Sequence, residues 1–428
     1  MTVLLYTLGC KVNQYESEAV GELFAKKGYE VLPSGNNADI IVINSCTVTA
    51  ESSRKTRQTV RKFRKANPDA VIVLTGCMVQ AFSKDAEALT EVDIIVGNTE
   101  TDKIPELCER FIAEKSRVLS VLPHENGEKY LDLSVSALSE HTRAFMKIED
   151  GCNRFCSYCI IPYARGRVRS RSLDSIKAEA IRLAEKGYKE IVLVGINLSA
   201  FGQDTGLTIC DAVTSVAEVK GIERIRLGSL ECDFMSDETL EKLSQCQKFC
   251  PQFHLSLQSG CDKTLKDMNR KYDTAFFADM VDRIRKSFDN PSITTDIMVG
   301  FAGETDEDFE ATCEFVKQIG FARSHVFVYS EREGTVAAKR DCRVPSEVRQ
   351  KRAGVMAEIC QNSEQEFLHS QIGLTSSVLF ETREGEFWTG YTENYTRVFV
   401  KDESVSEGDI LNVKLSVVDG DKIIGELA

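Results

Sequence analysis

The sequence lacks several features that would place the protein in a membrane or outside the cell. Its longest apolar runs, such as DIIVINSC and EIVLVGIN, have the length of a strand. They fall well short of the roughly 20 residues that a helix needs to cross a bilayer. The first residues, MTVLLYTLGCK, contain neither a basic leader nor a small-residue cleavage site. We therefore expect no secretory signal, no membrane contact and a cytoplasmic location.

A glycine pattern for dinucleotides is also missing, and basic residues are in the minority. No G-x-G-x-x-G follows the first apolar strands, which argues against a dinucleotide-binding domain. The chain has 53 Lys and Arg against 66 Asp and Glu, a net charge of −13. This total argues mildly against nucleic acid as a partner without excluding it, because binding depends on local basic patches.

What the sequence does contain is an unusual number of cysteines, 15 in 428 residues. Disulfides would be reduced in the cytosol, so these cysteines are expected to be core fillers, metal ligands or redox groups. The length exceeds what one hydrophobic core holds, which predicts two or three domains.

The hydrophobic pattern changes twice along the chain. From Thr2 to about Phe111, short apolar strands alternate with helical stretches, which predicts a parallel α/β sheet covered on both faces. Six further strand–helix units predict a partial (βα)6 barrel. The last stretch has short alternating strands and predicts a small β-barrel. The expected domains are residues 1–115, a linker 116–142, the partial barrel with its following helix 143–371, and the β-barrel 372–428.

One loop in the second domain carries three cysteines in the spacing C-x3-C-x2-C. The stretch EDGCNRFCSYCIIPYARGRVRSR contains Cys152, Cys156 and Cys159 just after the first barrel strand. Three thiolates on a short loop can hold a [4Fe–4S] cluster and leave one iron open to a substrate or cofactor. A zinc site would normally bring a fourth Cys or His nearby, and none follows. The alternative, three cysteines buried near a turn, is disfavoured because polar loops rich in cysteine make poor cores.

Three more cysteines share one position in the first domain. Cys10 follows VLLYTLG, Cys46 follows IIVINS and Cys77 follows VIVLTG. Each stands at the carboxyl end of an expected parallel strand, where ligands of open α/β sheets bind. The three side chains should therefore converge and form a second cluster site. The alternative is that they are small apolar fillers at strand ends.

The loop with Tyr158 before its last cysteine resembles the radical S-adenosylmethionine (SAM) family. The resemblance implies that SAM binds the open iron of the loop cluster and is cleaved to methionine and a 5′-deoxyadenosyl radical. It also implies a set of cofactor-binding residues at successive strand ends. These are Tyr158, Gly195, Asn197, Ser229, Glu231, Gln258, Asp296 and Gly300.

Two tri-cysteine sites followed by a β module resemble the radical SAM methylthiotransferases over essentially the whole chain. The motifs TLGCKVNQYESE, INSCTVT and LTGCMVQ are similar to the family's amino-terminal motifs, and the end of the chain is similar to its RNA-binding TRAM module. The resemblance implies SAM and two [4Fe–4S] clusters, of which the one on Cys10, Cys46 and Cys77 supplies sulfur. It also implies an electron donor such as a flavodoxin or ferredoxin, and a sulfur source.

The string KVNQ after Cys10 is similar to the branch that modifies N6-threonylcarbamoyladenosine at position 37 of tRNA. The expected product is the 2-methylthio derivative. Two other branches remain open: one acts on N6-isopentenyladenosine, where Gln-Met-Asn is more usual, and one acts on an aspartate of a small-subunit ribosomal protein. A protein of a different class, a non-catalytic RNA-binding iron–sulfur protein, is the further alternative.

Two basic runs lie close to the expected cluster sites. RKTRQTVRKFRK contains no acidic residue, and a second run directly follows the cysteine loop. Both are candidates for neutralising phosphates of the tRNA anticodon stem-loop, although a charge run is often only a solvated helix face. The candidate RNA-binding residues are Arg54, Arg57, Arg61, Arg64, Arg165, Arg167, Arg169 and Arg171.

Overall fold

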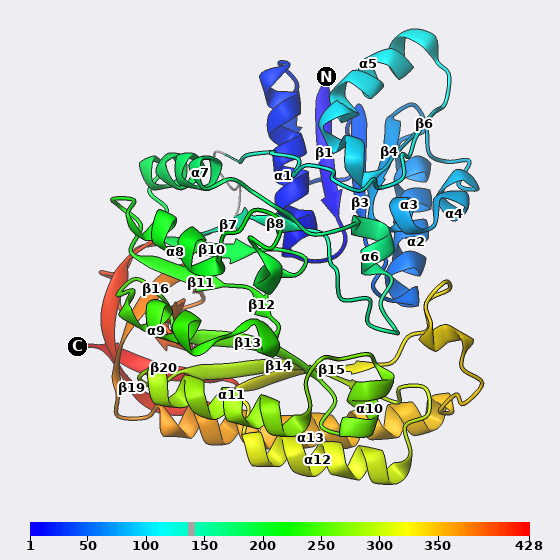
Figure 1. Ribbon diagram of the computed structural model, residues 1–428. Coiled ribbons are helices and arrows are strands. Elements are labelled where there is room, and N and C mark those ends of the chain that lie inside the picture. Colours follow the sequence, from blue (N-terminus) through cyan, green and yellow to red (C-terminus); the bar gives the residue numbers. More distant parts are fainter. Residues whose placement is uncertain (136–141) are drawn as a thin grey trace.

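The computed structural model describes residues 1–135 and 142–428. An N-terminal α/β sheet and a C-terminal β-barrel lie at different sides of a central βα domain (Figure 1). Residues 136–141, part of the expected linker, lie outside the described residues. Among the described residues, no helix is both long and apolar enough to cross a membrane.

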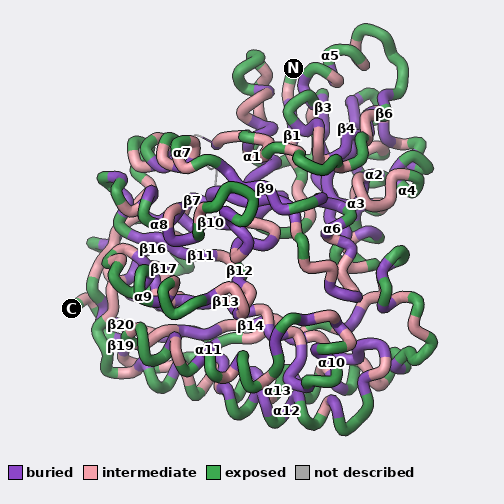
Figure 2. The backbone as a smooth tube through the Cα atoms, in the orientation of Figure 1, coloured by how far each residue is buried: buried purple, intermediate pink, exposed green. Residues whose placement is uncertain are grey.

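The N-terminal sheet is parallel throughout and has the strand order β2-β1-β3-β4-β5-β6. Helices α1 (Lys11–Lys26) and α5 (Ile104–Glu114) pack on one face, and α2 (Ala50–Ala66) packs on the other. Every residue of β3 and β4 is buried, as their continuous apolar runs require (Figure 2). The strands are β1 (Thr2–Thr7), β2 (Glu30–Leu32), β3 (Ile40–Ser45), β4 (Val71–Gly76), β5 (Ile94–Val96) and β6 (Val118–Ser120).

Two local expectations in this domain need correction. The hydrophobic pattern predicts one helix at about Val79–Leu89, but the structure breaks it at Phe82 into α3 (Cys77–Ala81) and α4 (Ser83–Glu87). The Phe82 ring packs against the guanidinium of Arg332, 4.8 Å away, and this contact comes from another domain. Strand β6 lies in the stretch expected to be linker, so the sheet extends past residue 115. The other domain boundaries stay predictions.

The central domain contains six parallel βα units, as expected. They form two sheets, β11-β10-β7 and β12-β13-β14-β15, because the third strand is interrupted at Gly228. The strands are β7 (Arg143–Lys147), β10 (Glu190–Val194), β11 (Arg224–Leu227), β12 (Ser229–Leu230), β13 (Gln252–Gln258), β14 (Ser292–Val299) and β15 (Arg323–Val328). The covering helices are α7 (Leu173–Glu185), α8 (Ile209–Ala217), α9 (Asp237–Gln245), α11 (Thr274–Ser287), α12 (Asp306–Ile319) and α13 (Ser346–Ser370).

Short elements at the carboxyl ends of these strands shape the loops. Strand β8 (Glu149–Asp150) pairs with β9 (Arg169–Ser170) and closes the base of the cysteine loop. Helix α6 (Ile161–Arg165) follows the third loop cysteine, and α10 (Asp262–Asp267) follows β13. These pieces direct the cysteine loop toward the N-terminal domain, where α6 packs beside α3.

The C-terminal strands form a closed barrel in the order β16-β17-β18-β20-β19, which confirms the expected small β-barrel. Arg224 and Arg226 of β11 donate hydrogen bonds to the backbone oxygens of Tyr391 and Glu393, so this barrel docks on the central domain. Its strands are β16 (Thr375–Glu384), β17 (Phe387–Thr392), β18 (Arg397–Val400), β19 (Ile410–Asp419) and β20 (Lys422–Leu427).

Candidate active site

The three strand-end cysteines lie at one edge of the N-terminal sheet. Cys10 caps α1 after β1, Cys46 follows β3, and Cys77 begins α3 after β4. Because β1, β3 and β4 are neighbours in the sheet, the three thiols come together at its carboxyl edge. Burial raises the pKa of Cys77 to about 12, Arg165 opposes this, and the charges of Cys10 and Cys46 add to it.

Two glycines with left-handed backbone angles precede Cys10 and Cys77 and turn the chain at the edge of the sheet. Gly9 has φ +124° and Gly76 has φ +96°. A Cβ on Gly76 would lie 2.4 Å from the Asn44 Oδ1, so only glycine fits before Cys77. In the stretches LGC and TGC, the glycine is therefore needed for the left-handed backbone turn, and the cysteine supplies the thiol.

Asn13 and Asn44 order the two loops that carry Cys10 and Cys46. The Asn13 Nδ2 donates to Asn44 Oδ1 at 2.9 Å, and Asn44 Nδ2 donates to the Asn13 backbone oxygen at 2.9 Å. The Cys10 thiol in turn donates to Asn13 Oδ1 at 3.2 Å. Both amides are buried, so this reciprocal pair fixes the spacing of the loops.

A second set of cysteines lies on the loop between β8 and α6. The backbone N–H of Cys159 donates to the Cys156 carbonyl at 3.0 Å, which folds the loop back on itself. Burial raises the pKa of Cys152 to about 11, and the charge of Cys156 adds to this. Gly151 stands before the loop at φ +90°, and a Cβ there would lie 2.0 Å from the Arg167 carbonyl oxygen.

Two side chains approach the thiols of this loop. The Asn197 Nδ2 lies 3.6 Å from Cys152 Sγ, and the Arg270 Nη1 lies 3.4 Å from Cys156 Sγ. Arg270 is buried and also donates to Glu231. The sequence does not indicate a role for Arg270, because an isolated arginine after a short helix carries no signal.

The expected cofactor-binding residues fall into two groups. Tyr158, Gln258 and Asp296 line a pocket of about 210 Å³ together with Cys159. Two glycines of the set allow close approaches instead: a Cβ on Gly195 would lie 2.7 Å from Glu149 Oε2, and one on Gly300 would lie 2.2 Å from Arg349 Cγ. Ser229 is exposed on β12.

The same pocket reaches the N-terminal domain. Val48 and Thr49, which follow Cys46 in the chain, line it opposite Cys159. The side chain of Val48 is 57% exposed and that of Phe327 is 47% exposed, although both are apolar. A small pocket with apolar walls thus lies between the two cysteine sites.

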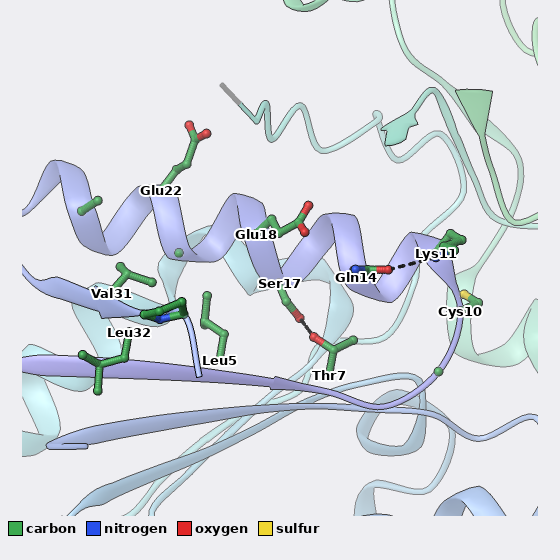
Figure 3. A pocket seen from close by; sticks show the side chains of 14 residues that line it. Leu5, Thr7, Cys10, Lys11, Gln14, Ser17, Glu18, Glu22, Val31 and Leu32 are labelled. Atoms are coloured by element: carbon green, nitrogen blue, oxygen red, sulfur yellow. Dashed lines mark hydrogen bonds between the residues drawn. The ribbon is translucent and has the colours of Figure 1, made fainter. Parts of the chain in front are cut away.

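A larger groove of about 820 Å³ starts at Cys10 and runs between α1 and the edge of the sheet (Figure 3). Leu5, Val31 and Leu32 form its apolar floor. The exposed Cys10 is therefore accessible from outside the domain contact.

The second basic run is largely buried, which corrects the expectation that it contacts RNA. Arg165 and Arg171 have exposed fractions of 0% and 1%, and Arg169 has 7%. Their partners are carboxylates, because an unpaired buried cation would be strongly unfavourable. Only Arg167 is exposed, and its guanidinium lies 4.7 Å from the centre of the Phe155 ring.

These buried arginines hold the N-terminal domain on the barrel. Arg165 pairs with Glu16 of α1, and Lys147 of β7 donates to the same carboxylate at 2.7 Å. Arg171 donates to the Tyr15 hydroxyl of α1 at 3.3 Å and pairs with Glu179 of the barrel helix α7 at 2.8 Å. Glu16 is far from Arg165 in the sequence, so the composition of the run alone could not reveal this pair.

The first basic run, on α2, remains on the surface. Arg54 pairs with Glu51, and Arg61 lies 3.3 Å from Glu91. Arg57 is partly buried. Arg64 binds Asp93 at 2.6 Å and the carbonyls of the following turn, so it stabilises the domain rather than offering a free charge.

The donor sets fit iron–sulfur clusters. Among the residues that the structure describes, no three His, Cys, Asp or Glu side chains converge on a point that one metal ion would occupy. A four-iron cluster is larger than a single ion, so its thiol ligands stand farther apart. Three thiols without a fourth Cys or His also differ from a structural zinc site.

The partial barrel and its three-cysteine loop define a radical SAM enzyme, and comparisons with known proteins agree. Residues 146–316 match the radical SAM superfamily, and residues 2–97 match the uncharacterized protein family UPF0004. A cobalamin- and [4Fe–4S]-bound radical SAM methyltransferase, TsrM from Kitasatospora setae, has the same fold. Its TM-score is 0.60 at 14% identity, covering 79% of this chain and 74% of that chain.

Curated relatives match nearly end to end. The threonylcarbamoyladenosine tRNA methylthiotransferase MtaB of Bacillus subtilis is 37% identical over 97% of this chain and 93% of its own length. The protein of that name from Aquifex aeolicus is 36% identical over 95% of this chain and 98% of its own. A tRNA-2-methylthio-N(6)-dimethylallyladenosine synthase of Clostridium botulinum is 33% identical over 98% and 95%. The chain therefore belongs to the radical SAM tRNA methylthiotransferases, enzymes that use SAM and [4Fe–4S] clusters.

Proposed function

We propose that the chain inserts sulfur and a methyl group at C2 of N6-threonylcarbamoyladenosine at position 37 of tRNA, beside the anticodon. The observation that carries the proposal is the pocket lined by both Cys159 and the residues after Cys46. A base placed there would face both cysteine sites at once. The more similar curated relatives, at 36% and 37% identity, are named for this substrate.

The six cysteines divide into two ligand sets under this proposal. Cys152, Cys156 and Cys159 would hold the cluster that leaves one iron open for SAM, and Cys10, Cys46 and Cys77 would hold an auxiliary cluster. When bound, the clusters and SAM supply the radical chemistry and the sulfur and methyl groups of the product. Three of the proposed SAM contacts, Tyr158, Gln258 and Asp296, line the pocket beside Cys159.

The other proposed SAM contacts surround the loop cluster. Asn197 approaches Cys152, and Glu231 is held by Arg270, which in turn contacts Cys156. Gly195 leaves space for the buried Glu149, whose Oε2 accepts the Asn197 backbone N–H at 2.7 Å. Burial raises the pKa of Glu149 well above its usual value, and the Asn197 backbone N–H opposes this.

We also propose how the chain meets its partners. The exposed arginines of α2 and Arg167 would contact the anticodon stem-loop, together with the C-terminal barrel. The reaction needs an electron and a sulfur atom that the chain does not supply, so a flavodoxin or ferredoxin and a sulfur source act with it. The groove at Cys10 is the open route for the sulfur. A tRNA substrate implies the cytoplasm.

A second candidate is N6-isopentenyladenosine, because a synthase for the dimethylallyl nucleoside is 33% identical over nearly the whole chain. Mass spectrometry of tRNA nucleosides from a strain that lacks this protein separates the two. We expect loss of 2-methylthio-N6-threonylcarbamoyladenosine and accumulation of its unmodified precursor. Loss of the isopentenyl product instead would support the second candidate, and unchanged tRNA would refute both.

A further inference from the structure

Two arginines of the central domain reach into the N-terminal cysteine site. Arg165, at the end of α6, donates from Nε to Cys77 Sγ at 3.2 Å. Arg332 lies in the loop after β15, and its Nη2 donates to Thr47 Oγ1 at 2.7 Å and to Ser53 Oγ at 3.0 Å. Thr47 directly follows Cys46, so the two guanidinium groups approach the cysteines from the barrel side.

The two arginines differ in how their charge is balanced. Arg165 is fully buried and carries the carboxylate of Glu16 as a partner. Arg332 is 7% exposed, yet no carboxylate lies within 4.0 Å of it among the described residues. The Nε of Arg332 also has no hydrogen-bond partner among the described residues. The Phe82 ring lies 4.8 Å from its guanidinium.

A buried cation without an anion is costly, because its loss of hydration is not compensated. Burial lowers the pKa of Arg332, and the charge of Cys46 is the main effect that opposes burial. The positive charge of Arg57 is close enough to lower the pKa of Arg332 further. Asp85 opposes burial too, more weakly than Cys46 and without forming an ion pair, so a bound anion beside Cys46 would complete the balance of charge.

We infer that Arg332 and Arg165 are positioning residues that complete the auxiliary site by balancing the negative charge of a cluster held by Cys10, Cys46 and Cys77. This inference rests on the proposed function, which assigns those cysteines to a cluster. An added electron makes a thiolate-bound cluster more negative, so nearby cations favour its reduced form and raise its midpoint potential.

The contact between the two domains is then also part of the auxiliary cluster site. Both arginines belong to the barrel, whereas all three cysteines belong to the N-terminal sheet. Docking of the two domains is therefore needed for the auxiliary cluster to have its full charge environment. Arg332 is the better probe, because Arg165 also holds the domains together through Glu16.

The test is an anaerobic redox titration of the reconstituted full chain, followed by electron paramagnetic resonance. Arg332→Gln and Arg332→Lys are compared with the unaltered chain, and again with Cys152, Cys156 and Cys159 all changed to Ala so that only the auxiliary site loads. We expect a more negative auxiliary midpoint potential for Arg332→Gln, restored by Arg332→Lys. Arg224→Gln, which removes a buried guanidinium at the C-terminal barrel, should leave that potential unchanged.

The potential and the iron content of the variants together test the role of Arg332. An auxiliary potential equal to that of the unaltered chain in Arg332→Gln, with equal iron content, would overturn the inference. Loss of auxiliary iron in Arg332→Gln but not in Arg332→Lys would support it, and the same loss in both variants would overturn it. An unaltered chain that loads only about four irons would instead overturn the cysteine assignment itself.

Discussion

Glu16 of α1 and Arg165 of α6 form a buried ion pair across the contact between the N-terminal sheet and the barrel. The Arg165 Nη2 lies 2.9 Å from Glu16 Oε2, and the Nε of the same side chain donates to Cys77. One arginine therefore links the helix that follows the radical SAM loop to the second cysteine site. The chemistry of the two sites depends on how well this contact is held.

Glu16→Gln should weaken the domain contact by about 1–3 kcal/mol, because it removes the carboxylate that Arg165 and Lys147 share and leaves them only Asp150 as a charged partner. The measurement is the urea midpoint of the reconstituted chain. Glu51→Gln is the control, since it removes an exposed carboxylate paired with Arg54 and should change the midpoint little. Equal midpoints for the two variants would contradict the structural role of Glu16.

The same pair predicts how the contact responds to acid. Burial raises the pKa of Glu16, but the charges of Arg165 and Lys147 outweigh burial and hold it below its ordinary value. Its contribution to stability is therefore complete above the ordinary glutamate pKa of about 4.3 and is lost as the pH falls through the lower folded value. Small-angle scattering should show no expansion between about pH 7 and pH 5. Expansion within that range would mean that other groups control the contact.

Replacement of one auxiliary cysteine should halve the iron content. We expect the reconstituted chain to bind about eight irons and Cys77→Ala to bind about four. Cys108→Ala is a matched control, because Cys108 is similarly buried but lies on α5 and packs in the hydrophobic core. A Cys77→Ala chain that still binds about eight irons would remove Cys77 from the ligand set.

The glycine before Cys77 should be far less replaceable than another glycine of the same domain. Gly76→Ala places a Cβ 2.4 Å from both Asn44 Oδ1 and the Ser45 backbone oxygen. Gly28, at φ +85°, has nothing within 4 Å, so Gly28→Ala costs only about 1–2 kcal/mol of left-handed strain. Gly76→Ala should lower thermal stability further and reduce auxiliary iron. Similar melting temperatures would contradict the close approach at Gly76.

The positions of the six cysteines could be predicted from the sequence because each depends on local signals. A thiol after an apolar strand, or three thiols in a short loop, can be recognised without knowing any distant contact. The roles of Arg165 and Arg171 could not, since a run of arginines resembles a solvated surface until Glu16 and Glu179 are placed beside it. Arg270 and Arg332 are isolated in the sequence and acquire meaning only from contacts formed by folding.

The break of the third barrel strand at Gly228 illustrates the same limit for the fold. The apolar pattern predicted one strand from Arg224 to Leu230, and the structure divides it between two sheets. Hydrophobic periodicity identifies that a segment is a strand. It does not report which neighbour each half pairs with, because that depends on the closure of the whole barrel.

The most direct test of the account is the reaction of the reconstituted chain with two anticodon stem-loops, one carrying N6-threonylcarbamoyladenosine and one carrying N6-isopentenyladenosine. With SAM, sulfide and a reductant, mass spectrometry should find a 2-methylthio product from the first RNA only. Cys10→Ala should still cleave SAM but form no methylthio product. Methylthiolation of the isopentenyl substrate alone, or full product from Cys10→Ala, would contradict the account.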